Sequence, residues 1–278
     1  MMRVGFITRY DRTADMDFAA AQGFFGLELM CWNSDGLLDQ ADTVRRNMEE
    51  RGLEIITMGF WGNNLDPSQR EVWQRRQAGV IDLAAKWNVK TVATFAGRDP
   101  TTDLAGNLKA FKEFWGPLAK RGEDKGVQIC FENCPMFDPR SLRSINIATT
   151  PAVWEQMFGE VDSPALGLQF DPSHLCWLQV DYLAALREFA PKIGLVHAKD
   201  TEMLPDVLAR VGILGRGWWR YRLPGLGAVD WKAFIGTLVE IGYTGDVAIE
   251  HEDPLYEGEK AHEGLLLARR HLEGLIAR

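Results

Sequence analysis

Short apolar segments alternate with longer amphipathic stretches along the whole chain. Eight of the apolar segments have the length and residue content of β-strands, and the stretches between them carry the start and stop signals of helices. This alternation predicts a parallel sheet whose strands are joined by helices. The predicted strands are residues 3–8, 26–30, 53–59, 91–95, 127–133, 166–171, 193–197 and 246–251.

Capping residues predict several helix boundaries. Aspartate before a helical pattern predicts helix starts at Asp66-Pro67 and Asp230-Trp231, and a last helix is expected from about 259 to 277. Glycine takes the left-handed conformation that closes a helix without strain. It therefore predicts helix ends at Arg51-Gly52, Lys125-Gly126 and Ile241-Gly242.

Eight strand–helix units fit the 278 residues of the chain, at about 35 residues per unit. Eight units favour closure into a barrel over an open doubly wound sheet, and no GxGxxG motif follows the first strand to favour a dinucleotide fold. We therefore predict an α/β fold, a (β/α)₈ TIM barrel, as one domain over residues 1–278. The longest irregular stretch, residues 201–229, is predicted to be a functional loop.

The last four predicted strands each end in a titratable residue, and the carboxyl ends of the strands carry the active site of a TIM barrel. These residues are Glu132, Asp171, His197 and Glu250. Side-chain alternation predicts that they point inward, because Phe131, Phe170 and Ile249 place large apolar groups on the opposite face. The strand at 193–197 alternates less clearly, with Gly194 predicted to face outward.

Inward carboxylates close to one another are costly unless a cation or a proton offsets their charge. Three carboxylates and an imidazole form a mixed oxygen and nitrogen site, which suits Mn²⁺, Mg²⁺ or Co²⁺ better than a metal that prefers thiolates. We therefore predict one divalent metal ion, with Mn²⁺ as the main expectation and Zn²⁺ as a further alternative. The other interpretation is that these residues bond helix caps or arginines around the rim.

Charge and composition narrow the partners. The net charge of −8, from 31 Lys and Arg against 39 Asp and Glu, argues against a nucleic-acid partner. No apolar run approaches the roughly 18 residues of a membrane span, and the N-terminus leads directly into a strand. We expect no membrane partner, no signal peptide and a cytoplasmic location. The cysteines contain no CxxC pair and are expected to be free thiols: Cys31, Cys130, Cys134 and Cys176.

The chain contains ten tryptophans, and several lie where loops are predicted. Indole rings in loops suit a site that stacks against the apolar faces of a sugar, and Trp61 is a candidate substrate contact. The alternative for each of them is packing in the core or in an interface. The tryptophans in predicted loops are Trp32, Trp61, Trp177, Trp218 and Trp219.

The strand ends resemble the xylose isomerase-like TIM barrel family, which includes ketose 3-epimerases, hydroxypyruvate isomerase, inosose dehydratase and endonuclease IV. The resemblance covers essentially the whole chain. It implies that the four strand-end residues hold the metal and that His174 faces the substrate. The motifs that carry it are Phe131-Glu132-Asn133, Phe170-Asp171-Pro172-Ser173-His174, Val196-His197-Ala198-Lys199-Asp200, Leu223-Pro224-Gly225-Leu226-Gly227 and Ile249-Glu250.

The chain departs from some members of this family. The ketose 3-epimerases have an arginine six residues after the histidine of the seventh strand, where this chain has Met203. Lys199 or Arg222 is predicted to contact the substrate instead, at a hydroxyl or a phosphate. The five histidines all lie at residue 174 or later, so the three-zinc site of endonuclease IV cannot be built in that form.

These features predict a metal-dependent isomerase or epimerase that acts on a small keto-sugar or aldose. Glu132 and Glu250 are the expected catalytic pair, in which one removes a proton next to the carbonyl and the other returns one through an enediolate. The alternatives are a metal-dependent dehydratase or lyase acting on a keto-sugar or inosose, and a sugar-binding barrel without activity. The resemblance also suggests a homo-oligomer, a dimer or a tetramer.

Overall fold

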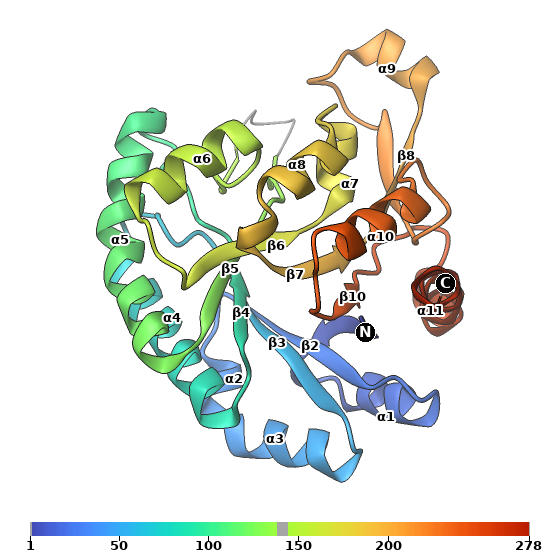
Figure 1. Ribbon diagram of the computed structural model, residues 1–278, viewed down its shortest axis with the longest axis horizontal. Coiled ribbons are helices and arrows are strands. Elements are labelled where there is room, and N and C mark those ends of the chain that lie inside the picture. Colours follow the sequence, from blue (N-terminus) through green and yellow to red (C-terminus); the bar gives the residue numbers. More distant parts are fainter. Residues whose placement is uncertain (1, 138–143, 278) are drawn as a thin grey trace.

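Eight parallel strands close into a barrel in the order β1-β10-β7-β6-β5-β4-β3-β2 in the computed structural model, which describes residues 2–137 and 144–277 (Figure 1). Helices surround the barrel on its outside. All eight predicted strands are confirmed, with shifts of one to two residues at most ends. The strands are β1 (Val4–Arg9), β2 (Gly26–Trp32), β3 (Glu54–Trp61), β4 (Thr91–Thr94), β5 (Gln128–Glu132), β6 (Leu166–Phe170), β7 (Ile193–Ala198) and β10 (Val247–Ile249).

Most of the predicted helix boundaries are confirmed. Gly52, Gly126 and Gly242 follow the ends of their helices with positive φ, and the Asp230 carboxylate accepts from the Ala233 amide at 2.9 Å. The helices around the barrel are α1 (Thr13–Ala21), α2 (Gly36–Asp39), α3 (Ala41–Glu50), α4 (Arg70–Trp87), α5 (Leu104–Lys125), α6 (Pro151–Glu160), α7 (Pro172–Trp177), α8 (Tyr182–Glu188), α10 (Trp231–Glu240) and α11 (Ala261–Ile276), with short 3₁₀ turns at Ala190–Lys192 and Gly258–Lys260.

The predicted helix start at Asp66-Pro67 is wrong. The Asp66 side chain accepts from the Ser68 amide at 2.9 Å, which closes a local turn, and α4 begins at Arg70. Aspartate satisfies a backbone amide two residues later in a turn as readily as it caps a helix, so the local sequence favours both structures.

The outward faces of the strands form the main core with the helices. Phe131 packs against Trp115 of α5 with ring centroids 4.8 Å apart, and Phe170 packs against Phe234 of α10 at 6.0 Å. The outward prediction for Gly194 is wrong, because a Cβ there would overlap the inward side chains of Gln128 and Cys130. The register between β6 and β7 shifts at this point, and a bulge turns the residue toward the barrel axis.

Much of the predicted loop at 201–229 forms regular secondary structure outside the barrel. Strands β8 (Asp200–Met203) and β9 (Trp219–Arg222) pair antiparallel, and α9 (Pro205–Val211) lies between them and stands away from the barrel (Figure 1). The buried Asp200 carboxylate anchors the chain that follows, because it accepts from the amides of Gly225, Gly227 and Val229 at 2.9–3.1 Å. The hairpin therefore brings β9 back to the mouth of the barrel.

The tryptophans are also placed differently from the prediction. Trp32 and Trp61 are the last residues of β2 and β3, Trp177 ends α7 and Trp219 begins β9, so four of the five lie in regular elements. The predicted strands at 26–30 and 53–59 ended two residues before Trp32 and Trp61, so these two tryptophans were assigned to loops.

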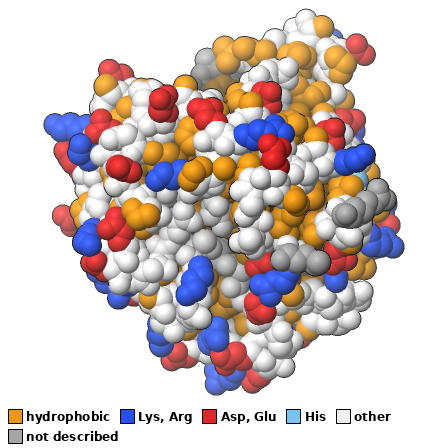
Figure 2. Space-filling view, viewed as in Figure 1, with side chains coloured by type: hydrophobic (Ala, Val, Ile, Leu, Met, Phe, Trp, Pro, Cys, Tyr) orange, Lys and Arg blue, Asp and Glu red, His pale blue; other side chains and the backbone are white. Residues whose placement is uncertain are grey.

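The surface in Figure 2 carries basic and acidic side chains interspersed over its periphery, with apolar side chains gathered at the top, over the α9 segment. Exposed apolar residues of this segment include Ile213 and Leu214. Within the described residues, no helix combines the length and the apolar character that crossing a bilayer requires.

Candidate active site

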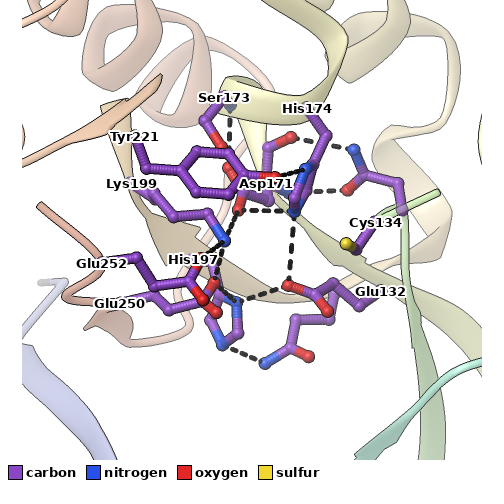
Figure 3. Close-up of polar contacts among 12 residues, drawn as sticks. Glu132, Cys134, Asp171, Ser173, His174, His197, Lys199, Tyr221, Glu250 and Glu252 are labelled. Carbon is purple, nitrogen blue, oxygen red and sulfur yellow. Dashed lines mark hydrogen bonds and ion pairs between the residues drawn. The ribbon is translucent and has the colours of Figure 1, made fainter. Parts of the chain in front are cut away.

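Four side chains from four different strand ends converge at the mouth of the barrel (Figure 3). One ligand atom of each lies within 4.8 Å of one ligand atom of every other, and all of these residues except Glu250 are buried. They are the residues that the sequence predicted as metal ligands: Glu132, Asp171, His197 and Glu250. Strand ends that are far apart in the sequence thus form one cluster because the barrel closes.

Hydrogen bonds to the backbone fix the position of Asp171. Asn133 accepts from the Asp171 amide at 2.8 Å and donates to the Asp171 carbonyl at 2.9 Å, which ties the end of β5 to the end of β6. Asp171 is also the N-cap of α7, where its Oδ1 accepts from the Ser173 amide at 2.8 Å. This cap leaves Oδ2 facing the site.

A buried glutamate that the sequence analysis missed lies behind His197. Glu28 of β2 is fully buried, and its Oε2 is 3.0 Å from His197 Nε2. The Gln169 amide donates to both Glu28 oxygens, at 2.9 and 3.0 Å. The alternation of side chains along β2 could have predicted this position. Leu27 and Leu29 face the helices, so Glu28 must face the inside of the barrel.

Glu28 sets the orientation of the imidazole. A proton on Nε2 that is donated to this carboxylate leaves the Nδ1 lone pair facing the cluster, where Nδ1 lies 3.1 Å from Glu132 Oε1 and 3.0 Å from Glu250 Oε2. The arrangement matches the carboxylate–histidine pairs that support histidine ligands in metal sites.

Replacing Glu28 by glutamine should weaken the binding of Mn²⁺ by about 10–100-fold, because the imidazole loses the carboxylate that fixes its tautomer. Calorimetric titration of metal-stripped protein measures this affinity directly. Glu54→Gln is the matched control, since Glu54 is an exposed partner of Arg3 at the start of β3. Equal affinities of wild type and Glu28→Gln would show that Glu28 only fills space.

Lys199 is the buried cation of the site. Its side chain is 1% exposed, and its ammonium lies 2.7 Å from Glu250, 3.0 Å from Glu252 and 3.3 Å from Asp171. It also lies 4.3 Å from the centroid of the Tyr221 ring. Burial lowers the pKa of Lys199, but the surrounding carboxylates outweigh this effect and raise it well above its ordinary value. The residue is therefore a fixed positive charge.

His174 lies one helical turn after Asp171 and is fully buried. Its Nδ1 shares a hydrogen bond of 3.0 Å with the Tyr221 hydroxyl, which orients the ring. Its Nε2 points into the cluster, 3.2 Å from Asp171 Oδ2 and 3.7 Å from Glu132 Oε1. Cys134 lies beside it, within reach of both Glu132 and His174 (Figure 3).

The donor set fits a divalent cation. Asp171 Oδ2 and His174 Nε2 are buried. Among the described residues they make ion-pair contacts, 3.2 Å from each other and, for Asp171, 3.3 Å from Lys199, but neither atom makes a hydrogen bond of good geometry. Five carboxylates, counting Glu28 and Glu252, face the buried Lys199 and two imidazoles. A divalent cation would offset this excess of negative charge. The residues that would hold the cation are Glu132, Asp171, His197 and Glu250, because their ligand atoms lie within 4.8 Å of one another.

The two candidate catalytic glutamates are held ionised. Burial and the Glu250 carboxylate raise the pKa of Glu132, but its contacts with His174 and His197 outweigh them and lower it overall. Burial also raises the pKa of Glu250, and the charges of Lys199 and His197 lower it well below its ordinary value. Both groups are thus available to accept a proton near neutral pH.

A cavity of about 960 Å³ opens above the cluster. Aromatic rings line it on two sides. On one side Trp61 lies 4.8 Å from Phe95 and 6.4 Å from the His197 ring, between ring centroids. On the other side Trp219 stacks on Trp177 at 4.7 Å. Glu132, Lys199 and Glu250 are among the polar groups that reach the cavity.

The predicted substrate contacts separate into two groups. Trp61 and Lys199 line the cavity, and His174 borders it through the cluster. Arg222 is placed differently, because its guanidinium is bound by Asp253 at 2.8 Å and by Glu202 at 2.6 Å. In the structure Arg222 holds β9 in place and is not one of the described residues that line the cavity.

The profile of the xylose isomerase-like TIM barrel matches residues 16–272, which is most of the chain. The chain belongs to this family. Family membership agrees with the closed barrel and with the position of the cluster at the strand ends. It confirms the family predicted from the sequence motifs.

The proteins similar to this chain carry names that point to more than one reaction. The inosose dehydratase of Clostridium beijerinckii is 27% identical over 84% of this chain and 80% of its own. A D-tagatose 3-epimerase-like protein superposes with a TM-score of 0.76 at 19% identity, covering 99% of this chain and 98% of its own. The IolI protein with a bound zinc atom superposes with a TM-score of 0.75 at 19% identity over 99% and 98%. Family membership therefore leaves the reaction open.

Proposed function

We propose that this protein is a divalent-metal-dependent isomerase or epimerase that transfers a proton next to the carbonyl of a small sugar. The observation that carries the proposal is the pair of glutamates, Glu132 of β5 and Glu250 at the end of β10, whose carboxylates lie 3.1 and 3.0 Å from His197 Nδ1. Two bases at one centre are what removal of a proton and its return to another position require.

The chain's own residues would divide the work as follows. Glu132 or Glu250 takes the proton from the carbon next to the carbonyl. The other carboxylate takes a proton from solvent water and delivers it to the opposite face or to the neighbouring carbon, and the first glutamate then releases its proton to solvent. His174, held by Tyr221, bonds a substrate oxygen through Nε2. Lys199 keeps Glu250 ionised between turnovers, and Trp61 and Phe95 cover the apolar face of the sugar.

The cofactor that we propose is Mn²⁺, with Mg²⁺, Co²⁺ or Zn²⁺ as alternatives, because the donors are three carboxylates and one imidazole. A bound divalent ion supplies the Lewis acidity that makes the proton next to a carbonyl acidic enough for a carboxylate base. The zinc in the IolI structure supports a metal in this fold, although it concerns that protein.

Incubation of the Mn²⁺-loaded protein with keto-sugars, aldoses and inososes in D₂O tests the proposal. Deuterium should appear next to the carbonyl of one substrate class, and the exchange should stop when EDTA removes the metal. Nuclear magnetic resonance locates the deuterium, and mass spectrometry counts it. Metal binding without exchange on any member of the panel would rule out the proton-transfer reaction.

A dehydratase is the second candidate, and one observation favours it. His174 Nε2 lies 3.2 Å from Asp171 Oδ2 and 3.7 Å from Glu132 Oε1, so a candidate proton donor stands beside the candidate base. Elimination of a hydroxyl group needs such a donor in addition to a base. The same incubations distinguish the two reactions, because elimination changes the substrate mass by one water and epimerisation does not.

A further inference from the structure

We propose that Cys134, His174 and Glu132 form a second cation site, which takes an ion that prefers sulfur ligands, such as Zn²⁺, beside the proposed metal site. One ligand atom of each residue lies within 4.8 Å of one ligand atom of the other two. The donors are a sulfur, a nitrogen and an oxygen, whereas the proposed metal site has only oxygen and nitrogen donors. Binding at the second site is independent of the proposed function, and only its effect on catalysis rests on it.

Buried Asn146 holds the backbone that carries two of the three donors. Glu132 is the last residue of β5, and Cys134 follows it by two positions. The Asn146 side-chain amide donates to the Glu132 carbonyl at 2.9 Å and to the Cys134 carbonyl at 2.7 Å, so both residues are fixed from the same side chain. Figure 3 shows the Cys134 sulfur pointing toward the space between Glu132 and His174.

His174 presents the third donor atom to the same space. Its ring is fully buried, and the Tyr221 hydroxyl lies 3.0 Å from Nδ1. This hydroxyl can accept the Nδ1 proton, which leaves the Nε2 lone pair facing the cluster, as in histidines that bind metals. Nε2 is buried and makes no hydrogen bond of good geometry among the described residues. Because buried polar atoms normally have a partner, a cation bound at Nε2 would complete the contacts of the imidazole.

The spacing of the donors suits a tetrahedral ion. Bonds of about 2.0–2.3 Å from Zn²⁺ to nitrogen, oxygen and sulfur place tetrahedral ligands roughly 3.3–3.8 Å apart. His174 Nε2 and Glu132 Oε1 are 3.7 Å apart, which lies within that range. Cys134 and Glu132 also line the cavity, so an ion can enter from solvent and keep a water molecule as its fourth ligand.

Glu132 is the carboxylate that the two sites would share. Its Oε1 lies 3.1 Å from His197 Nδ1, a donor of the proposed metal site, and 3.7 Å from His174 Nε2. Two divalent ions that share ligands in one site are typically about 3.5–4 Å apart. The position of this carboxylate therefore allows both ions to be bound at once.

The charge of the cluster favours a second ion. Five carboxylates of the described cluster face one ammonium group, that of Lys199, which leaves an excess of four negative charges when both imidazoles are neutral ligands. One divalent ion offsets two of these charges. A second divalent ion, which binds as Cys134 loses its thiol proton to solvent, would reduce the remaining excess from two charges to one.

An ion at the second site would inhibit the proposed reaction. It would occupy His174 Nε2, which the proposed function assigns to a substrate oxygen, and it would also hold Glu132, one of the two proposed bases. Mn²⁺ prefers oxygen ligands and should fill the proposed metal site alone. The Cys134 thiol would therefore make the enzyme sensitive to an excess of zinc.

Titration of the metal-stripped protein with Cd²⁺ tests the site, because a cadmium–thiolate bond absorbs in the ultraviolet and a cadmium–carboxylate bond does not. We expect calorimetry to find two equivalents of Cd²⁺ and one of Mn²⁺, and the absorption to appear with Cd²⁺. Cys134→Ser should bind one equivalent of each ion and lack the absorption. Cys176→Ser is the matched control, since Cys176 is also partly buried but is not among the described residues that line the cavity, and it should behave like the wild type.

The wild-type titration decides the number of ions without any variant, and the binding of Mn²⁺ by Cys134→Ser shows that its fold and the proposed metal site are intact. One equivalent of Cd²⁺ in the wild type, or two equivalents with the same absorption in Cys134→Ser, would overturn the second site and leave the proposed metal site standing. No binding of either ion would overturn both sites.

The inhibitory role is tested separately, on a substrate that the Mn²⁺-loaded protein exchanges in D₂O. A second equivalent of bound Zn²⁺ should stop the exchange in the wild type, and Cys134→Ser should not show this loss. Exchange that continues with two Zn²⁺ ions bound would overturn the inhibitory role.

Discussion

Replacing Glu132 or Glu250 by glutamine should lower the overall conversion of the substrate by about 10²–10⁴-fold, because each variant removes one group that transfers a proton. The two variants should differ in which proton they still exchange. If the reaction is an epimerisation with one base on each face, Glu132→Gln retains exchange from one epimer and Glu250→Gln retains it from the other. Measuring deuterium incorporation separately from each epimer shows this pattern.

Two controls make this result specific to the bases. Glutamine keeps an oxygen donor, so calorimetry with Mn²⁺ establishes that each variant still binds metal before the rates are compared. Glu240→Gln changes an exposed partner of Arg187 and should leave the rate unchanged. If exchange persists from both epimers in both variants while metal is bound, neither glutamate is the base. Loss of all exchange in only one variant would instead indicate a single-base isomerase.

Replacing Lys199 by methionine should lower the free energy of unfolding of the metal-free protein by about 3–5 kcal/mol, which is typical when one partner of a buried ion pair is removed. The variant leaves Asp171 and Glu250 without the ammonium that lies 3.3 and 2.7 Å from them. Mn²⁺ should recover much of the loss, since both carboxylates belong to the proposed metal site. Urea unfolding with and without Mn²⁺ measures both effects.

Lys120→Met is the matched control for Lys199. Lys120 binds Asp124 at 2.7 Å, but its side chain is 67% exposed, and solvent screening should leave the unfolding midpoint unchanged. A Lys199→Met protein as stable as the wild type without metal would mean that the buried carboxylates are neutralised in another way.

Acid should reduce the difference between Lys199→Met and the wild type. The pKa of Glu250 is lowered in the folded protein, partly by Lys199, so this carboxylate stabilises the fold above its unfolded pKa of about 4.3 and loses that contribution as the pH falls through its folded value. The variant lacks part of this lowering and has less to lose. Unfolding without metal between pH 7 and strong acid should show a constant gap that narrows only below the ordinary pKa of glutamate.

Much of the architecture could be predicted from local patterns. Alternating apolar strands and capped helices indicated eight units and hence the barrel, because burial on the strand faces and helix capping are decided by residues near one another in the chain. The cluster at the strand ends followed from the same alternation, together with the rule that the carboxyl ends of parallel strands share one edge.

Contacts between distant segments decided the rest. Glu28 of β2 belongs to the site because it contacts His197 of β7. Arg222 was predicted to contact the substrate, but in the structure its guanidinium binds Glu202 and Asp253. The sequence by itself determined which residues of the regularly alternating strands face inward, since a strand alternates with a period of two, and it failed at Gly194, where a bulge breaks that period. Only the tertiary structure decided which inward groups meet, because ion pairs such as those of Lys199 join residues about 30–50 positions apart.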